Sequence, residues 1–267
     1  MNTRLIALAT AALLVALPAR AQDWAKPRLD GKSPRHQEWV KVMNGKREVQ
    51  SFITYPEVKD KATAVVVLHE IFGLSDWARS VTDELAEAGY IAIAPDLLSG
   101  VGPNGGGTST LAAADIGKDI QALPADQITG DLKAVTDYVS KLPSCNGKVV
   151  IAGFCWGGGQ VFRFATNNKD VKAVFSFYGN QPDKPEDIAR ISAPIYGFYA
   201  GNDARVDATI PQTTTLMKAA GKVYEPVIYD GAGHGFMRAG EDPAGNAPNK
   251  KARNEAFQRW LDLMKKV

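Results

Sequence analysis

The sequence predicts an α/β domain built on a doubly wound, mostly parallel sheet. Apolar runs of strand length recur along the chain, and segments with apolar residues at helical spacing lie between them. This alternation is typical of parallel strands that are covered by helices on both faces. With 267 residues, of which 45% are hydrophobic and 22% charged, the chain has enough apolar material for one sizeable core.

The first 21 residues have the pattern of a signal peptide. Residues 1–4 are short and basic, residues 5–17 are apolar, and Ala19 and Ala21 place small side chains where a signal peptidase reads them. The apolar run is shorter than the roughly 20 residues of a spanning helix. We therefore expect cleavage after Ala21, a periplasmic or secreted protein, and no membrane span in the mature chain.

The charge of the mature chain excludes some classes of partner. Cleavage removes Arg4 and Arg20 and no acidic residue, so the formal net charge falls from +2 to 0. A protein without net charge has no general affinity for nucleic acid or for an acidic membrane surface. We expect a monomer whose partner is a small molecule.

The remaining elements follow in order along the chain. Residues 22–46 predict an extended lead-in, and residues 47–267 the α/β domain. Residues 47–55 are β-rich and predict a strand at an antiparallel edge of the sheet. Further strands are expected at residues 64–68, 90–94, 149–152, 173–178, 195–200 and 223–229. Helices are expected at residues 76–88, 128–142, 158–166, 209–219 and 251–265.

One connection is longer than the others. Residues 99–126 are rich in Gly and Ala, and a connection of this length is usually functional or mobile. We expect this segment to overhang the functional site.

A Gly-rich turn at residues 153–158 follows an apolar strand and precedes a helix. Its sequence, Gly-Phe-Cys-Trp-Gly-Gly, is that of a nucleophile elbow with Cys155 where serine usually stands. Small residues on both sides let strand and helix approach closely, so that Cys155 projects above the sheet. The alternative is an ordinary turn in which Cys155 is a small buried hydrophobe.

The two cysteines are not expected to form a disulfide. Cys145 and Cys155 lie near opposite ends of one predicted strand, which rises about 3.3 Å per residue. Their separation therefore exceeds the Cα distance of roughly 7 Å that a disulfide can bridge. We expect Cys155 to be a free thiol and Cys145 to be structural.

Three reactive residues follow predicted strands at their carboxyl ends, where such sheets carry their sites. Cys155 follows the strand at 149–152, Asp203 follows that at 195–200, and His234 follows that at 223–229. Nucleophile, acid and histidine in this order are typical of the α/β-hydrolase triad. A thiol with a pKa of about 8.5 is mostly protonated at neutral pH and needs a base to become a thiolate. We expect His234 to be this base and Asp203 to orient its imidazole.

Each member of this triad has an alternative. His234 could be a loop histidine bonded to backbone, in which case His36 or His69 would have to supply the base. Asp203 could be an ordinary turn aspartate, because Gly-Asn-Asp is common turn chemistry, and Asp207 is its main competitor.

An oxyanion formed at Cys155 would need backbone donors. The elbow offers the amide of Trp156, and the loop after the strand at 64–68 offers the amide of Ile71.

Five motifs together resemble the dienelactone hydrolase family, from about residue 47 to the end of the chain. They are His69-Glu70-Ile71-Phe72-Gly73, Ala94-Pro95-Asp96-Leu97, Gly153-Phe154-Cys155-Trp156-Gly157-Gly158, Gly201-Asn202-Asp203 and Gly233-His234-Gly235-Phe236. The resemblance implies an α/β-hydrolase fold with a minimal cap. It also implies Cys155, Asp203 and His234 as the triad, acting through an acyl-thioester intermediate.

The resemblance assigns roles to two further charged residues. Glu70 matches a glutamate that contacts the resting thiol and helps to form the thiolate, and Arg238 matches an arginine that binds the carboxylate of a dienelactone. The family's second such arginine falls within residues 99–126, where this chain has only Lys118. The resemblance therefore predicts the reaction type, the hydrolysis of small esters or lactones, rather than dienelactone itself.

Several other residues are weaker candidates. Tyr178 and Phe236 are expected as pocket walls, Trp156 as a residue packed beneath the elbow helix, and Arg79 as an exposed helical arginine. No residue cluster has metal-ligand spacing and no phosphate loop follows the first strand, so neither metal nor cofactor is expected.

Two rival functions remain at this level. A cysteine peptidase or acyltransferase could use the same triad, but it would need an extended cleft or a second acceptor site. A non-catalytic binding protein could keep the fold as a scaffold, although it would need no matched nucleophile and base.

Overall fold

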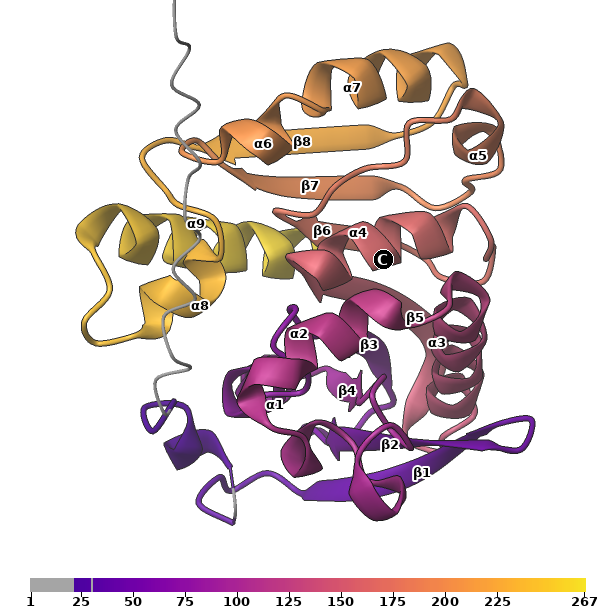
Figure 1. Ribbon diagram of the computed structural model, residues 1–267, viewed down its shortest axis with the longest axis vertical. Helices are drawn as coiled ribbons and strands as arrows, with labels where there is room; N and C mark the ends of the chain where they lie inside the picture. The colour runs from indigo at the N-terminus through magenta and orange to yellow at the C-terminus, as the bar shows by residue number, and fades with distance from the viewer. Residues whose placement is uncertain (1–21, 30) are drawn as a thin grey trace, which may run out of the picture.

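A mixed sheet between two layers of helices forms the centre of the computed structural model, which describes residues 22–29 and 31–267 (Figure 1). The strand order is β1-β2-β4-β3-β5-β6-β7-β8. The strands β1 and β2 pair antiparallel, as do β2 and β4, and the other neighbours pair in parallel. Their bounds are β1 Gln37–Asn44, β2 Arg47–Thr54, β3 Ala62–Leu68, β4 Ile91–Pro95, β5 Cys145–Phe154, β6 Val174–Phe177, β7 Ile195–Ala200 and β8 Tyr224–Tyr229.

The six strands expected to be parallel are all present, and the doubly wound sheet is confirmed. The antiparallel end of the sheet differs from expectation. Strand β2, expected at the edge, is the second strand, and β1 forms the edge from residues assigned to the lead-in 22–46. Only Val42 of β1 is buried, so the strand has no apolar run to reveal it. The sheet therefore begins ten residues earlier than residue 47, at Gln37.

The helices divide between the two faces of the sheet. Helices α1, α8 and α9 pack on one face, and α3, α4 and α7 pack on the other. Strand β3 shows the alternation directly, because Val65 and Val67 face the first layer while Val66 and Leu68 face the second. The helices are α1 Asp76–Glu87, α2 Ala113–Ala122, α3 Ala125–Ser140, α4 Trp156–Ala165, α5 Pro185–Ala189, α6 Ala204–Asp207, α7 Ile210–Ala219, α8 Phe236–Glu241 and α9 Ala247–Met264, with 3-10 turns η1 Lys26–Arg28, η2 Pro103–Gly105 and η3 Thr108–Thr110.

The long connection at residues 99–126 is folded against the loop that follows β3. Asp96 accepts hydrogen bonds from the backbone N–H and the hydroxyl of Thr108, at 2.7 and 2.8 Å, and the Thr108 oxygen accepts from the amide of Leu74. Helix α2 continues this cover, since a Cβ built on Gly117 would contact the Ile71 side chain at 3.7 Å. The segment thus lies over the loop that carries Ile71, as expected.

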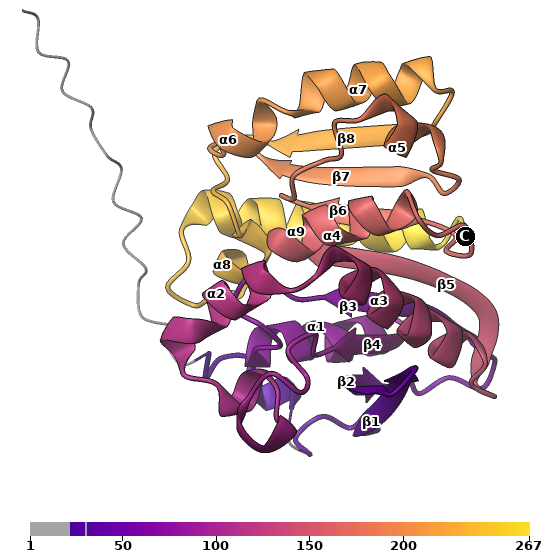
Figure 2. The same cartoon turned by 45° about the vertical axis from the view of Figure 1, so that its right-hand side comes forward.

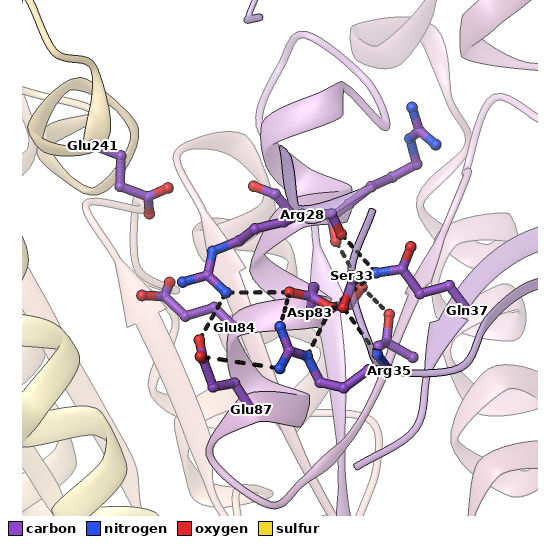
Figure 3. Close-up of polar contacts among 12 residues, drawn as sticks. Arg28, Ser33, Arg35, Gln37, Asp83, Glu84, Glu87 and Glu241 are labelled. Atoms are coloured by element: carbon purple, nitrogen blue, oxygen red, sulfur yellow. Dashed lines mark hydrogen bonds and ion pairs between the residues drawn. The ribbon is translucent and has the colours of Figure 1, made fainter. Parts of the chain in front are cut away.

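The N-terminal lead-in is held to α1 by one buried carboxylate (Figure 3). Asp83 accepts hydrogen bonds from four side chains of the lead-in and β1, which are Arg28, Ser33, Arg35 and Gln37. Burial disfavours the charge of Asp83, but the donors Arg35, Ser33 and Arg28 outweigh it and lower the pKa of the carboxyl below its ordinary value. The lead-in is therefore part of the folded domain.

The two cysteines occupy opposite ends of one strand. Cys145 begins β5 and is buried, Cys155 directly follows its end, and both are free thiols. The predicted absence of a disulfide between them is confirmed. The predicted signal peptide, residues 1–21, lies outside the described residues. In the part of the chain that is described, no helix is both long and apolar enough to cross a membrane.

Candidate active site

The candidate residues converge at the carboxyl edge of the parallel strands. Cys155 follows β5, Asp203 follows β7, His234 follows β8, and Glu70 follows β3. Figure 2 shows α2, α6 and α8 gathered at this same edge, toward which the arrows of β7 and β8 point. Crossover connections bring every parallel strand back in the same direction, which is why residues far apart in sequence meet here.

Cys155 sits in a strained backbone turn between β5 and α4. Its dihedral angles are φ 55° and ψ −118°, a conformation that side-chain-bearing residues rarely adopt. The turn requires glycines around it, because a Cβ on Gly153 would lie 2.3 Å from the Gly157 carbonyl oxygen, and one on Gly157 would lie 2.4 Å from the His69 carbonyl oxygen. The elbow geometry predicted from the motif is present.

Three side chains form a hydrogen-bonded chain at this edge. His234 Nε2 lies 3.0 Å from Cys155 Sγ, and His234 Nδ1 lies 2.5 Å from Asp203 Oδ2. Asn202 fixes the two loops relative to each other, because its amide N–H donates to the Ala232 carbonyl and its side chain to that of Gly231. The imidazole is therefore held between a thiol and a carboxylate.

The structure distinguishes the alternatives that the sequence left open. Asp203, not Asp207, is bonded to the imidazole, and Asp207 lies at the end of the short helix that Asp203 caps. His69 is fully buried and stacks on Trp156 with ring centroids 5.8 Å apart, while His36 lies against Tyr55. His234 is thus the histidine that contacts the thiol.

Burial and charge keep the thiol protonated. Desolvation first, and then the negative charge of Glu70, raise the pKa of Cys155 to about 11. Hydrogen bonding from the backbone N–H groups of Trp156 and Ile71 acts in the opposite direction. Both amides therefore lie near the sulfur.

Glu70 is bound by an arginine and a tyrosine. Arg238 Nε donates to Glu70 Oε2 at 2.6 Å, and the Tyr178 hydroxyl donates to Oε1 at 3.3 Å. Glu70 is only 3% exposed, so its charge reaches Cys155 through a poorly screened interior. Gly235, at φ 80°, allows α8 to begin against this pair, since its Cβ would lie 3.4 Å from Arg238 Nη2. The carboxylate is held by these two residues rather than by the thiol.

The expected pocket walls have a different position. Tyr178 and Phe236 are both fully buried, and the Tyr178 ring packs edge-on against His234 and Phe236 at 5.1 and 5.2 Å. Tyr178 therefore supports the imidazole, Phe236 supports Tyr178, and neither presents an open surface to a ligand. Trp156 is the first residue of the elbow helix α4, and its partly buried side chain packs against the core. Arg79 is not exposed but half-buried, and it lies over the ring of Phe52.

Two residues near the site were missed in the sequence. Phe72 is 44% exposed directly after Ile71, and the Arg238 guanidinium lies 5.0 Å from its ring centroid. Arg205, two residues after Asp203, is exposed, and its charge acts to lower the pKa of Cys155. Phe72 lies inside a quoted motif and Arg205 lies two residues after another, so closeness to a motif in the sequence was the available signal. Lys118, the one base of residues 99–126, is exposed on α2.

The family model and the sequence relatives agree on one family. The model of the dienelactone hydrolase family matches residues 49–267. A relative from Escherichia coli named "Putative carboxymethylenebutenolidase" is 33% identical over 213 residues, which cover 75% of this chain and 76% of the relative. One of the same name from Saccharolobus solfataricus is 30% identical over 252 residues, covering 82% and 95%.

A solved structure supports the fold independently. A dienelactone hydrolase-like promiscuous phosphotriesterase from metagenomic libraries superposes with a TM-score of 0.75 at 23% identity, covering 87% of this chain and 98% of that one. At this level of identity the likeness concerns the fold alone, which is that of the α/β hydrolases.

Proposed function

The chain belongs to the dienelactone hydrolase family of hydrolases, and from that premise we propose that it cleaves small esters or lactones with Cys155 as nucleophile. One observation carries the proposal. His234 lies 3.0 Å from the Cys155 sulfur and 2.5 Å from the Asp203 carboxylate, and a strained elbow holds the partly buried nucleophile at the carboxyl edge of the sheet.

The geometry suggests a two-step reaction. His234 takes the thiol proton while the sulfur attacks the substrate carbonyl, and the amides of Trp156 and Ile71 stabilise the resulting oxyanion. Collapse breaks the ester bond, and the imidazolium returns the proton to the departing alkoxide. Asp203 stabilises the imidazolium during this step. Water activated by His234 then cleaves the thioester, releasing the acid and restoring the thiol.

The protonated thiol explains how the site rests between turnovers. With a pKa raised to about 11, Cys155 is almost entirely uncharged at neutral pH. Since the thiolate is the form that oxidants attack, a protonated thiol suits a protein in an oxidising compartment. We propose that Glu70 assists thiolate formation once substrate displaces its present partners, Arg238 and Tyr178.

Export is part of the same proposal. Gln22, the first residue after the predicted cleavage site, accepts a hydrogen bond through its side-chain oxygen from the Trp77 amide at 2.7 Å. The lead-in is thus folded from the residue at which a mature chain would begin. N-terminal sequencing of protein recovered from the periplasm or the medium tests this, with Gln22 expected first and Met1 contradicting it.

Initial rates of hydrolysis test the proposed function. The protein beginning at Gln22 is assayed on small aryl esters and lactones beside Cys155→Ala and Cys155→Ser, with folding of each variant checked by its melting temperature. Activity that disappears in Cys155→Ala establishes the thiol mechanism. Rates equal in wild type and Cys155→Ala refute the assigned nucleophile, and transfer to an added acceptor instead of water would indicate an acyltransferase.

A further inference from the structure

Gln22, the first residue of the proposed mature chain, caps the amino end of α1. The helix begins at Asp76 after its N-cap Ser75, whose hydroxyl accepts a hydrogen bond from the Ala78 amide. The amide of Trp77 donates instead to the side-chain oxygen of Gln22 at 2.7 Å. The first N–H groups of a helix have no partner within it, so Gln22 satisfies one of them from 55 residues away in sequence.

The residues after Gln22 hold this contact in place. The Ala25 amide donates to the Gln22 carbonyl at 2.8 Å. Ala25 and Leu29 are buried in the same core as Trp77. The side-chain oxygen and the backbone carbonyl of Gln22 are thus both bonded within the folded domain, and its backbone nitrogen is the atom that cleavage would make the chain terminus.

A terminal glutamine carries a nucleophile and an electrophile in one residue. Its α-amine can attack the side-chain carbon Cδ and close a five-membered lactam, which is pyroglutamate. The N–Cδ bond forms, the Cδ–Nε2 bond breaks, and Nε2 leaves as ammonia with a proton that the amine gives up. An α-amine with a pKa of about 7.7–8.0 is partly unprotonated at neutral pH, so the step needs no further reactant.

The contact with α1 acts on the atom where negative charge develops. Attack on Cδ turns the side-chain oxygen of Gln22 into an oxyanion, and this is the oxygen that the Trp77 amide binds. The helix end adds a partial positive charge at the same place. The folded protein therefore stabilises the intermediate of cyclisation.

The charges near this helix end also favour the lactam. A terminal ammonium beside the positive end of α1 is disfavoured. The two adjacent carboxylates already bind cations, Asp76 to Arg79 at 2.7 Å and Asp23 to Lys26 at 2.7 Å. Cyclisation removes the ammonium without disturbing either ion pair.

We propose that Gln22 is a modification site that cyclises to pyroglutamate in the folded protein, with the Trp77 amide as oxyanion donor, and that the lactam carbonyl then remains as the cap of α1. The proposal rests on the proposed export, which makes Gln22 the first residue, and it does not depend on ester hydrolysis. The lactam keeps the accepting oxygen, and its ring removes side-chain rotations that an open glutamine loses on folding. The mature lead-in would thus carry a blocked, uncharged terminus.

Two other accounts of Gln22 lead to different results. If the side chain only caps α1, the residue stays glutamine and the folded protein keeps its full mass. If cyclisation is the unassisted chemistry of any terminal glutamine, it proceeds equally fast in folded and unfolded chains. Assistance by the fold alone makes the folded protein react faster.

The rate of ammonia loss tests this directly. Protein beginning at Gln22 is released from a fusion partner by a protease, and its mass is followed at about pH 8, where much of the amine is unprotonated. One half is kept folded and the other in urea above the unfolding transition. We expect the folded protein to lose ammonia about 10-fold faster, an effect below that of an oxyanion donor in a closed active site. Equal rates, or a slower folded protein, overturn the proposal.

Two matched proteins show which residue reacts. Gln22→Glu keeps an accepting oxygen but has no amide nitrogen to expel, and a chain beginning at Ala21 holds the Gln22 nitrogen in a peptide bond. Both should keep their full mass under conditions in which the chain beginning at Gln22 loses ammonia. Equal loss in either protein would place the reaction at another residue and contradict the assignment.

Melting temperatures test whether the lactam remains the cap. Gln22→Ala removes the acceptor for the Trp77 amide and should melt about 2–4 °C below the cyclised protein. Gln121→Ala changes an exposed glutamine of α2 and should melt with the wild type. A cyclised protein that melts no higher than Gln22→Ala would show that the lactam does not cap the helix.

The exported protein separates failure of this inference from failure of the proposed export. Because a lactam blocks Edman degradation, the first peptide of protein from the periplasm or medium is read by mass spectrometry. A peptide that begins at Gln22 and lacks one ammonia supports both proposals, and the same peptide at full mass supports export and overturns the modification. A peptide beginning elsewhere contradicts the cleavage site, and the rates measured on the chain beginning at Gln22 then decide the chemistry.

Discussion

Cys155 occupies a position where backbone strain and electrostatics act together. The positive φ of 55° holds the sulfur above the sheet edge, and burial with Glu70 raises its pKa to about 11. His234 lies at 3.0 Å and can accept the proton when a carbonyl arrives. The residue is consequently placed for attack while it remains uncharged at rest.

The acidity of Cys155 predicts its alkylation behaviour. Because the pKa is raised, the thiolate is scarce at pH 7 and becomes abundant only as the pH approaches about 11, so iodoacetamide should react more slowly than with a free thiol. Glu70→Gln removes a charge that raises this pKa. We expect the alkylation rate at pH 8 to increase about 3- to 10-fold. Glu255→Gln, an exposed change on α9, is the control, and an unchanged rate in Glu70→Gln contradicts the assigned cause.

The choice between two aspartates gives a second prediction at this scale. Asp203→Asn keeps the shape of the side chain but removes its negative charge and offers an N–H donor to His234 Nδ1, which favours the wrong imidazole tautomer, so kcat should fall by about 10²- to 10⁴-fold. Asp207→Asn, one helical turn further on, should keep nearly full activity. Steady-state kinetics with an aryl ester measure both, and similar losses in the two variants would argue against the triad assigned here.

At the scale of elements, the helix α4 approaches the sheet through glycines. A Cβ on Gly157 would lie 2.4 Å from the His69 carbonyl oxygen, and one on Gly158 would lie 2.6 Å from that of Phe177. These neighbours are backbone atoms that cannot move independently of β3 and β6. The glycines of residues 153–158 are therefore needed for the close packing of α4 on the sheet as well as for the turn at Cys155.

Alanine substitutions at Gly157 of α4 and at Gly117 of α2 should separate the effect of close packing from that of helix propensity. Gly157→Ala is expected to destabilise the protein by about 3 kcal/mol or more, because either α4 or the β3 loop must shift. Gly117→Ala in α2 meets Ile71 only at 3.7 Å and should stabilise by up to about 1 kcal/mol through helix propensity. Urea denaturation measures both changes, and equal effects would refute the packing explanation.

Elements with a continuous apolar signal were predicted from the sequence, and those without one were missed. The parallel strands are buried on both faces, so their apolar runs were visible. Helix α2 buries only Ile120, and β1 buries only Val42, so neither has a stripe or a run. Both are held by tertiary contacts, β1 by its eight-residue pairing with β2. Sequence periodicity cannot report such contacts.

At the scale of the whole molecule, the lead-in, the sheet and the helical layer on one face form a single folded unit. Arg253 of α9 binds Glu84 of α1 and Glu241 of α8, which joins three helices of that layer. The Asp83 cluster ties the lead-in to the same helix α1. The loop that carries Ile71 leads directly into α1, so the N-terminal segment supports the site from behind.

This anchoring predicts the effect of losing the buried carboxylate. Asp83→Ala removes the buried carboxylate that Arg28 and Arg35 share and leaves them the exposed Glu87 as a common partner, so the unfolding free energy should fall by about 2–4 kcal/mol. Asp262→Asn, whose carboxylate is exposed on α9 beside Lys265, should leave stability unchanged within measurement. Thermal and urea unfolding measure the two variants, and a stable Asp83→Ala protein would show that the lead-in is only loosely attached.

The chain order of the reactive residues, together with the parallel sheet, was enough to predict where they meet. The side-chain contacts between these loops could not be predicted from the sequence, because they depend on the direction in which each side chain points. Asp203 rather than Asp207 contacts His234 because β7 ends at Ala200. The hydrogen bond from Arg205 to Asn180 depends on the path of the loop after β6. The burial of Tyr178 and Phe236 behind His234 likewise follows from how α8 packs. These are properties of tertiary packing rather than of any local motif.

Detection of the acyl-enzyme tests the central claim most directly. Wild-type protein is mixed with an aryl ester, quenched in acid within the first turnover and examined by mass spectrometry, beside Cys155→Ala. The account predicts an added acyl group on the peptide that contains Cys155, formed and lost at rates consistent with turnover and absent from the variant. Turnover that continues in Cys155→Ala, or an acyl group found on another residue, would contradict the thiol mechanism.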